Sequence, residues 1–582
     1  MPSITISSPT APPDWALLQR ELMRAQATAC EIFYHRYFDI RGYLKCIPRW
    51  GGNDGPDDAI ENLTGYSMVH TLGGPQHILD LYKQAWEGHI QQYSEAVTVD
   101  VPIARSGMYY KDFPACFDWF HHGESLTIFN LQGLSDPYEV EFGHRTQKYA
   151  GFYMDEDPQA KNYDPEHKII KSLFNGSRGP LLRKATALDW AGDTFEVEGR
   201  FPNPRHGEST FEEMLMHFQE YTDVVGDQPM NLAATTLGLN AYALTGQDKY
   251  KNWLLEYVDA WADRAAQNNG ILPSNIGLDG TIGGECDGKW YGGCYGWGFT
   301  VTVPQNGTRS DRNALYRGVA GFGNALLLTG DQKYPNVWGT MLNSVNSNSK
   351  TENGQTLYPH MHGDDGWYGF KPQPYNQGAL DVYYWTMNEA DLQYVPQNPW
   401  LDFLQGKNEN YPADTLRNAL SSIRTKMEHV RNDTTGTDTR LSDDPIPYNP
   451  ATTVNTLIQQ QLGGLAPRHG ELLHARVRYF DPKNQRPGLP QDVAALVESL
   501  TADSVTLSLV NINQTENRDV IIQAGAYAEH QFTSVVSDGQ SKSLDTSWLV
   551  ARLAPGCGTK LTLKTDRYVN QPTFLFPWDR DN

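Results

Sequence analysis

The tripeptide His-Gly-Glu occurs three times in this chain, and its first copy stands among residues suited to acid–base chemistry. That copy, His122-Gly123-Glu124, lies in the stretch DWFHHGES, which adds Trp119 and a second histidine, His121. Histidine and glutamate exchange protons near neutrality, and glycine lets a loop turn so that both side chains reach a cleft. Two adjacent histidines beside an aspartate are costly to bury without a function. We therefore predict catalytic roles for His121, His122 and Glu124, and substrate contact by Trp119.

The second and third copies are His206-Gly207-Glu208 and His469-Gly470-Glu471. Ser209 followed by Glu212 has the spacing of a capping box, which places His206 and Glu208 in a loop just before a helix. The first copy is expected to precede a helix in the same way. We predict substrate contact for His206 and Glu208. The alternative for each copy, a polar loop residue that caps a helix, stays open.

A basic stretch, HKIIKSLFNGSRGPLLRK, runs from His167 to Lys184. It holds five Lys or Arg residues and no acid. Asn175 and Arg178 lie in a glycine-flanked turn, where side chains and backbone N–H groups suit a carboxylate or sulfate. We predict catalytic roles for Asn175 and Arg178 and substrate binding by Arg183. The alternative is a solvated basic helix followed by a turn.

Aromatic residues interleave with nine glycines in GLDGTIGGECDGKWYGGCYGWGF, residues 277–299. Such a loop suits stacking on sugar rings, although it is also compatible with plain packing. We predict Tyr291 and Tyr295 as candidate bases and Trp290 and Trp297 as substrate contacts.

Two segments contain metal-ligand types, HMHGDD and MDEDP, but neither has helical histidine spacing or the EF-hand glycine. His360 and His362 of the first are predicted to contact substrate instead. No metal site and no cofactor are expected, and the acidic segments leave room only for a structural divalent cation.

Helical hairpins are the elements that would position these residues. The phrases LTGQDKY and LTGDQKY place a Thr-Gly turn at Thr245-Gly246 and again at Thr329-Gly330. Apolar residues recur at helical spacing on both sides of each turn, and glycine ends a helix readily in the left-handed conformation. Each phrase therefore predicts helix, glycine stop, helix, with both turns on one rim of the fold.

These hairpins, with their x-T-G-[DQ]-x-[KR]-Y turns and long aromatic loops, resemble the (α/α) toroids of carbohydrate-active enzymes, which include polysaccharide lyases, glycoside hydrolases and sugar epimerases. The resemblance covers residues 12–460 and implies a cleft at one face of the ring. After Leu465 the pattern alternates, as in SVTLSLVNINQ from Ser504, which predicts antiparallel strands. The expected fold is therefore mainly α with a β domain: a toroid over residues 1–464 and an antiparallel β-sandwich over 465–582.

Composition limits the classes of partner that this chain is expected to bind. The formal charge of −22 over 582 residues argues against nucleic acid and anionic membranes. No apolar run is long enough to span a bilayer. The first residues lack the basic and apolar regions of a signal peptide, as expected of a cytoplasmic protein or of a chain whose leader was removed. The expected partner is an oligo- or polysaccharide of acidic character, and the sequence does not indicate an oligomeric state.

Three functions fit these residues. A polysaccharide lyase acting on a uronic-acid glycan is favoured because the toroid lyases use Asn, His and Arg to neutralise the uronate and Tyr or His as the base. It requires the His121–Glu124 segment and the turn at Asn175–Arg178 to share one cleft. A glycoside hydrolase would instead use two carboxylates, for which this chain offers Asp118, Glu124, Glu208, Asp279 and Glu285. The third alternative is a glycan-binding protein without catalysis.

Overall fold

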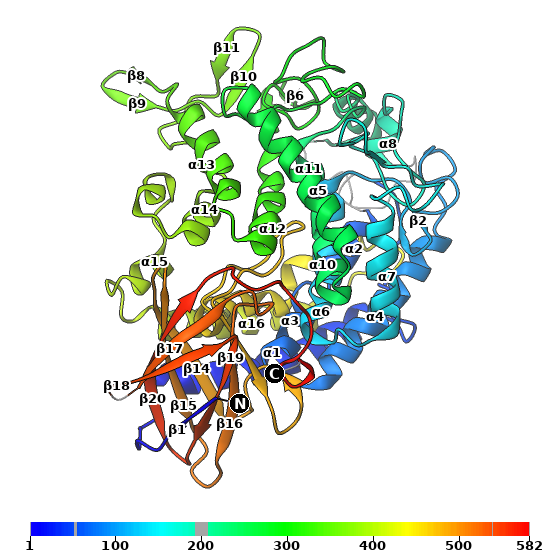
Figure 1. The fold of residues 1–582 in the computed structure, drawn as a ribbon. Helices are drawn as coiled ribbons and strands as arrows, with labels where there is room; N and C mark the ends of the chain where they lie inside the picture. Colours follow the sequence, from blue (N-terminus) through cyan, green and yellow to red (C-terminus); the bar gives the residue numbers. More distant parts are fainter. Residues whose placement is uncertain (1, 52–54, 193–207, 538, 581–582) are drawn as a thin grey trace.

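The structure is a computed structural model that describes residues 2–51, 55–192, 208–537 and 539–580. Helices are the main regular elements of the chain up to residue 462, and the strands of two sheets follow (Figure 1). The α-helices are α1 Asp14–Tyr37, α2 Pro56–Glu61, α3 Tyr66–Thr71, α4 Gln76–Glu95, α5 Trp119–Asn130, α6 Gln132–Ser135, α7 Val140–Gly151, α8 Ala187–Ala191, α9 Phe211–Phe218, α10 Thr235–Thr245, α11 Asp248–Gln267, α12 Val319–Thr329, α13 Lys333–Asn346, α14 Ala379–Thr386, α15 Pro399–Leu404, α16 Tyr411–Asn432 and α17 Val454–Leu462.

Short helical turns and two-stranded hairpins fill the connections between these helices. The 3₁₀ turns are η1 Pro229–Ala234, η2 Leu315–Gly318, η3 Glu389–Tyr394, η4 Ile446–Tyr448, η5 Pro450–Thr453 and η6 Pro577–Asp579. The hairpins pair β2 Tyr109–Tyr110 with β3 Phe113–Pro114, β4 Tyr163–Asp164 with β5 Ile169–Ile170, β6 Thr300–Thr302 with β7 Arg309–Asp311, β8 Lys350–Glu352 with β9 Gln355–Leu357, and β10 Met361–Gly363 with β11 Gly366–Tyr368.

The repeated Thr-Gly phrase forms the hairpins α10–α11 and α12–α13, as predicted. Gly246 and Gly330 end the first helix of each hairpin at φ values of 67° and 69°. In both turns the threonine hydroxyl donates to the carbonyl four residues earlier, at 2.7 Å for Thr245 and 2.8 Å for Thr329. Each hydroxyl also accepts from the amide two residues later, so Thr and Gly together satisfy the helix end.

Inner and outer helices differ in their burial, which explains their sequences. Helix α12 buries every residue from Val319 to Leu328 and carries almost no charge. Its partner α13 buries only one face, through residues such as Tyr334 and Trp338. A helix apolar on all sides must be surrounded, whereas an amphipathic one lies at the surface. The α10–α11 pair repeats this division.

The hairpins form a ring. Successive contacts join α3 to α4, α7 to α10, α10 to α12 and α13 to α14, and α1 returns to α16 and α4. Gln571 bonds the hydroxyl of Tyr242 and the carbonyl of Leu328, so both Thr-Gly turns lie on one rim, as predicted. The toroid-like fold class predicted from the sequence is confirmed.

The C-terminal strands form two five-stranded sheets, which confirms the predicted antiparallel β domain. One has the order β1 (Ser3–Ile6), β19 (Trp548–Leu553), β16 (Arg518–Ala524), β12 (Val477–Asp481), β13 (Arg486–Pro487). The other has the order β14 (Val493–Leu500), β15 (Ser504–Asn511), β20 (Gly558–Asp566), β17 (Gln531–Ser537), β18 (Gln540–Thr546). In β20, Leu561 and Leu563 are buried while Lys560 and Lys564 are exposed, the alternation of a strand with one face on a core.

Strand β1 belongs to the sandwich although it precedes the helices. It pairs in parallel with β19, from Ser3 opposite Val550 to Ile6 opposite Leu553. One apolar core also runs through helices and strands. The division into residues 1–464 and 465–582 therefore stays a prediction, and residues 3–6 depart from it in space. Among the described residues no helix has the length and apolar composition needed to cross a bilayer.

Candidate active site

A cavity of about 370 Å³ opens where the N-terminal ends of α2, α5 and α12 meet, the last of these through η2. It lies at the opposite end of α12 from the Thr-Gly turn. The lining residues are acidic and aromatic for the most part: Gly51, Gly55, Asp57, Asp58, Glu61, Phe117, Phe120, His121, Glu124, Phe174, Asp189, Trp190, Phe218, Tyr221, Tyr295, Asp311, Arg312, Asn313, Ala314 and Tyr316.

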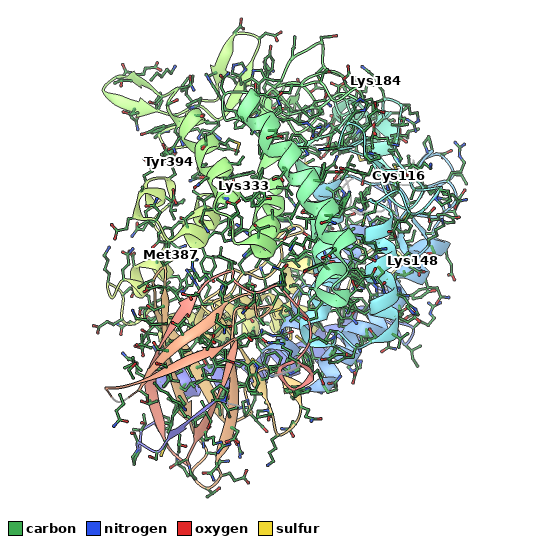
Figure 2. All side chains as sticks on the ribbon, viewed as in Figure 1. Cys116, Lys148, Lys184, Lys333, Met387 and Tyr394 are labelled. Carbon is green, nitrogen blue, oxygen red and sulfur yellow. The ribbon has the colours of Figure 1, made fainter. Side chains whose placement is uncertain are left out.

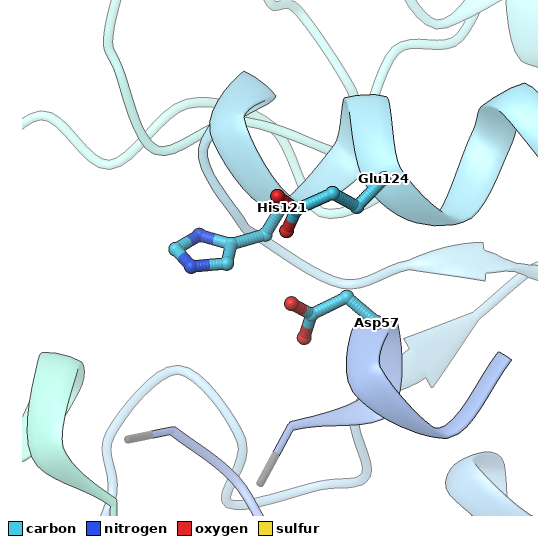
Figure 3. A group of neighbouring side chains, drawn as sticks. All are labelled: Asp57, His121 and Glu124. Carbon is cyan, nitrogen blue, oxygen red and sulfur yellow. The ribbon is translucent and has the colours of Figure 1, made fainter. Parts of the chain in front are cut away.

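Asp57, His121 and Glu124 converge in this cavity (Figure 3). One polar atom from each lies within 4.8 Å of the others. His121 and Glu124 are three residues apart on α5, so they share one face of the helix. Asp57 lies in the first turn of α2 and faces them across the gap. Its side chain is only 3% exposed, and its Oδ1 has no hydrogen-bond partner among the residues that the structure describes.

Asp118 fixes the position of His121. It is the N-cap of α5, where its Oδ1 accepts from the His121 backbone amide at 3.0 Å and lies 2.8 Å from His121 Nδ1. Burial opposes charge on the imidazole, but Asp118 and Asp57 outweigh it and raise the pKa of His121 to about 10. His121 is therefore an imidazolium at neutral pH.

Whereas His121 is charged at neutral pH, the carboxyl groups of α2 tend to be protonated and neutral. Burial, reinforced by the negative charge of Glu124, raises the pKa of Asp57 to about 7. Burial and repulsion from Asp57 raise the pKa of Asp58 well above its ordinary value, and burial and repulsion from Glu124 do the same to Glu61. The carboxyl groups on the α2 side of the cavity thus keep their protons at pH values where exposed carboxyl groups are already ionised.

Arg317 balances Glu124 from the other side. Its Nη2 lies 2.9 Å from Glu124 Oε1, and both side chains are largely buried. The guanidinium also lies over the Phe120 ring, 3.7 Å from its centroid, and donates to the Phe120 carbonyl. His469 Nδ1 lies 3.6 Å from the same Glu124 oxygen. Burial and the charge of Arg317 lower the pKa of His469 to about 3, so this imidazole is neutral.

Two of the three His-Gly-Glu copies meet here, glycine against glycine. A Cβ on Gly123 would lie 2.6 Å from the His469 carbonyl oxygen, and one on Gly470 would lie 3.4 Å from the Gly123 Cα. Only glycine allows this approach, which brings His469 beside Glu124. The expectation that the first copy precedes a helix is wrong, because α5 begins at Trp119 and the copy lies inside it.

Aromatic side chains form the opposite wall. Tyr295 stacks on Phe120 with ring centroids 5.5 Å apart, and its edge contacts Trp190 and Tyr221. Together with the carboxyl groups, these rings give a cavity with flat apolar faces and concentrated hydrogen-bonding groups, the combination that sugar rings require.

Asp57, His121 and Glu124 are also ligand types for a divalent cation. Asp118 would then hold the histidine ring from behind, as carboxylates commonly do behind metal-bound histidines. Arg317 and the His121 imidazolium already supply positive charge beside Asp57 and Glu124. The chain's own residues therefore balance the negative charge of these two carboxyl groups.

Of the predicted catalytic residues, His121, Glu124 and Tyr295 line the cavity. His122 does not: it points into the core, where its Nε2 donates to the Asn175 carbonyl at 2.8 Å and burial lowers its pKa to about 4. Trp119 and Asn175 are also fully buried and bond one another. The hydrogen bonds of His122 and Trp119 to Asn175 thus fix the segment around Asn175, whose backbone pairs with Phe117, beside α5.

Phe174 of the basic stretch lines the cavity, but none of the lysines or arginines of the stretch does. Arg178 stacks over the Tyr110 ring at 4.4 Å and donates to the Ser106 carbonyl. Arg183 pairs with Asp189 at 2.8 Å, and Lys184 lies at the periphery beside α8 (Figure 2). The expectation that the turn at 175–178 shares the cleft with His121 and Glu124 is wrong, since none of its residues lines the cavity.

The glycine-rich loop contributes Tyr295 to the cavity and otherwise lies further out. Trp297 is buried and donates to the Leu272 carbonyl. Trp290 and Tyr291 pack on His362, and His360 donates to the Gln373 carbonyl. Of these residues, Tyr291 lines a separate groove.

The second His-Gly-Glu copy is described only in part. His206 lies outside the described residues. Glu208 is buried, with its carboxylate 3.1 Å from His217 Nδ1, and does not line the cavity. The helix after it, α9, begins at Phe211 with Thr210 as its cap, so the predicted Ser209–Glu212 box is shifted by one residue.

Sequence reasoning missed Asp57, Asp58, Glu61 and Arg317. The segment GPDD has the residues of a helix N-terminus, and α2 begins there at Pro56. An acidic pair in a first helical turn is so common that it carries no signal of catalysis. Their shared place in one cavity depends on the packing of α2 against α5, which is a tertiary contact.

Comparison with known proteins identifies a family but no activity. The family described as Domain of unknown function (DUF8034) matches residues 3–358. No curated protein matches the chain. Among solved structures, a sugar epimerase from a ruminal bacterium has 11% identity and a TM-score of 0.34, covering 75% of this chain and 97% of its own. An inactive variant of the GH76A alpha-1,6-mannanase of a Salegentibacter species, in complex with alpha-1,6-mannotriose, has 10% identity and a TM-score of 0.28, covering 75% and 99%. At these values the likenesses concern the path of the chain alone.

Proposed function

Because the chain belongs to the family described as Domain of unknown function (DUF8034), which names no activity, we propose a function from the cavity itself. We propose that the protein is a carbohydrate-active enzyme that hydrolyses the glycosidic bond of a neutral glycan. The observation that carries the proposal is the pairing of Asp57, protonated up to about pH 7, with the ion-paired Glu124 across a gap of less than 4.8 Å.

Each carboxyl group suits one of the two roles in glycoside hydrolysis. Asp57 holds a proton that it can give to the glycosidic oxygen, and Arg317 holds Glu124 where it faces the sugar. Carboxyl groups about 5 Å apart leave no space for a water molecule between them and the sugar, so Glu124 would attack the anomeric carbon directly as the leaving oxygen takes the proton of Asp57. The Asp57 carboxylate would then take a proton from a water molecule, which displaces Glu124 from the anomeric carbon and releases the sugar. The proposal therefore includes retention of anomeric configuration.

The substrate is proposed to be neutral because acids dominate the cavity. Asp57, Asp58, Glu61 and Glu124 line it, whereas no lysine or arginine of the basic stretch that favoured a uronate does. The cations Arg317 and His121 already pair with Glu124 and Asp118, so neither is available to neutralise a uronate as β-elimination requires. The hydrolase is therefore preferred to the lyase.

The test is a screen of neutral and uronate polysaccharides with wild type, Asp57→Asn and Glu124→Gln, and with Asp263→Asn on the exposed face of α11 as control. Hydrolysis predicts reducing ends without absorbance near 235 nm, lost in both site variants and kept in the control. Proton NMR of the first product should show the substrate's anomeric configuration. Unsaturated product from uronates, or full activity in Asp57→Asn, would refute the proposal.

A second candidate, sugar epimerisation, is favoured by the proximity of His121 to Glu124. His121 is protonated and can donate a proton, and the Glu124 carboxylate on the same face of α5 can accept one. Epimerisation beside a carbonyl breaks and remakes a C–H bond, so free sugars incubated in D₂O would gain deuterium at that carbon. Hydrolysis gives no such exchange, so deuterium uptake by free sugars without new reducing ends would favour the epimerase.

A further inference from the structure

A second groove, of about 630 Å³, lies outside the candidate active site between the glycine-rich loop and the hairpin β10–β11. We call it the outer groove. It is larger than the central cavity, and the hairpin β10–β11, which contributes to its lining, lies at the top of Figure 1. Its walls are the half-buried rings of Tyr291, Phe299, Trp367 and Tyr368.

The outer groove has the surface chemistry of a sugar site. Four aromatic rings offer flat apolar faces, and Asp364 and Asp365 are exposed at the same place. Gly292, Gly293, Gly298, Gly363 and Gly366 form part of the floor, where no side chain keeps a ring away from the backbone. Flat apolar faces beside charged hydrogen-bonding groups match the two faces and the hydroxyl edge of a pyranose.

The groove is also preorganised. His362 packs between Trp290, Tyr291 and Trp367, with centroids 4.6, 4.8 and 4.9 Å away. The Tyr291 hydroxyl donates to Asp364 at 2.8 Å, and Lys289 pairs with the same carboxylate at 2.8 Å. Side chains that are already fixed lose little conformational entropy when a ligand binds.

One aromatic layer separates the outer groove from the central cavity. Phe299 lines the groove, and its ring lies 5.0 Å from Tyr221 and 5.7 Å from Tyr295, which both line the cavity. The two hollows therefore lie on the two sides of one aromatic layer. A glycan chain long enough to extend from the cavity around this layer would reach the outer groove.

We propose that the outer groove binds further units of the same glycan whose scissile bond lies in the central cavity. The inference rests on the proposed function and deepens it, because it assigns a polymeric or long oligomeric substrate. Trp367 is the central stacking residue, and Asp364 is the hydrogen-bonding residue.

The decisive variant is Trp367→Ala, with Trp367→Phe as the conservative replacement. Tyr394→Ala, at the residue labelled in Figure 2, is the control: it removes a half-buried aromatic ring that does not line the groove. The kcat/KM of each is measured on oligomers of increasing length of the glycan found in the screen. Loss of one stacking ring predicts a fall of about fivefold to tenfold for the longest oligomers and a shrinking effect as the oligomers shorten. Trp367→Phe should recover most of the loss, and Tyr394→Ala should show no length dependence.

Binding is measured separately, so that failure of the proposed chemistry leaves the groove testable. Native electrophoresis in gels containing neutral polysaccharides is run with wild type, Asp57→Asn and Trp367→Ala. Retardation that persists in Asp57→Asn and is lost in Trp367→Ala supports the groove even where nothing is hydrolysed. Equal retardation of wild type and Trp367→Ala, or a loss of kcat/KM independent of oligomer length, overturns the inference.

Discussion

Replacing Asp57 by asparagine should stabilise the protein at alkaline pH while abolishing its activity. Asp57 has a raised folded-state pKa, about 7 against an ordinary 3.8. A carboxyl group of this kind adds most to stability below pH 3.8, where it is protonated in both states, and that contribution is lost as pH rises towards 7. At pH 8 the folded chain must hold a buried anion beside Glu124. Asparagine has nearly the same shape and no charge to bury.

The magnitude follows from the same pKa values. At about 1.4 kcal/mol per pH unit, the anion costs about 4 kcal/mol at pH 8 and less than about 2 kcal/mol at pH 5. Unfolding of 582 residues has an entropy of about 1.2 kcal/mol per kelvin. The melting temperature of Asp57→Asn should therefore rise by about 3 °C at pH 8 and by about half as much at pH 5.

Differential scanning calorimetry of wild type and Asp57→Asn at both pH values measures this difference. Asp263→Asn serves as control, because that aspartate is exposed and its replacement should change the melting temperature by less than about 0.5 °C at either pH. A melting temperature that falls at pH 8, or a gain equal at pH 5 and pH 8, would refute the assignment of Asp57 as a buried proton carrier.

Three further predictions test the neighbours of Asp57. Arg317→Met leaves Glu124 without its cation, so it should lower the free energy of unfolding by about 3 kcal/mol, measured as a fall of about 2 °C in melting temperature, and abolish activity. Arg317→Lys should have a melting temperature and an activity between those of Arg317→Met and wild type. Gly123→Ala gains about 1 kcal/mol of helix propensity but places a Cβ 2.6 Å from a backbone oxygen, so calorimetry should show net destabilisation and assays a reduced rate. Dialysis against EDTA should leave hydrolysis unchanged, because Arg317 and His121 already supply the positive charge; restoration of a lost rate by a divalent cation would show that a metal is needed.

The fold was predictable because its signals are local. The Thr-Gly turns specify their geometry through the threonine hydroxyl and the left-handed glycine, and alternating residues such as Leu561 and Leu563 specify strands. The parallel pairing of β1 was not predictable, since four residues carry no sign of a partner so far along the chain.

The site was only partly predictable, because the position of a side chain around the axis of α5 decides whether it points into the cavity. His121 and His122 differ by one position, or about 100° around α5. That step sends one imidazole into the cavity and the other into the core, with pKa values shifted in opposite directions. The basic stretch misled because its composition does not reveal that Arg183 already pairs with Asp189 and that Arg178 stacks on Tyr110.

The pairing of β1 with β19 constrains how the chain folds during synthesis. Strand β1 is made before the whole helical ring and β19 after it, and Lys542 Nζ reaches the Ser3 carbonyl across 539 positions. Until the last strands emerge, β1 has an unpaired edge and the apolar surface beneath the sandwich is uncovered. Contacts between residues so far apart in the sequence form slowly. The helical ring therefore stays without the sheets that cover it until the C-terminal strands have been synthesised. Expression at low temperature or with a chaperone that shields apolar surface should therefore raise the soluble yield of the full chain.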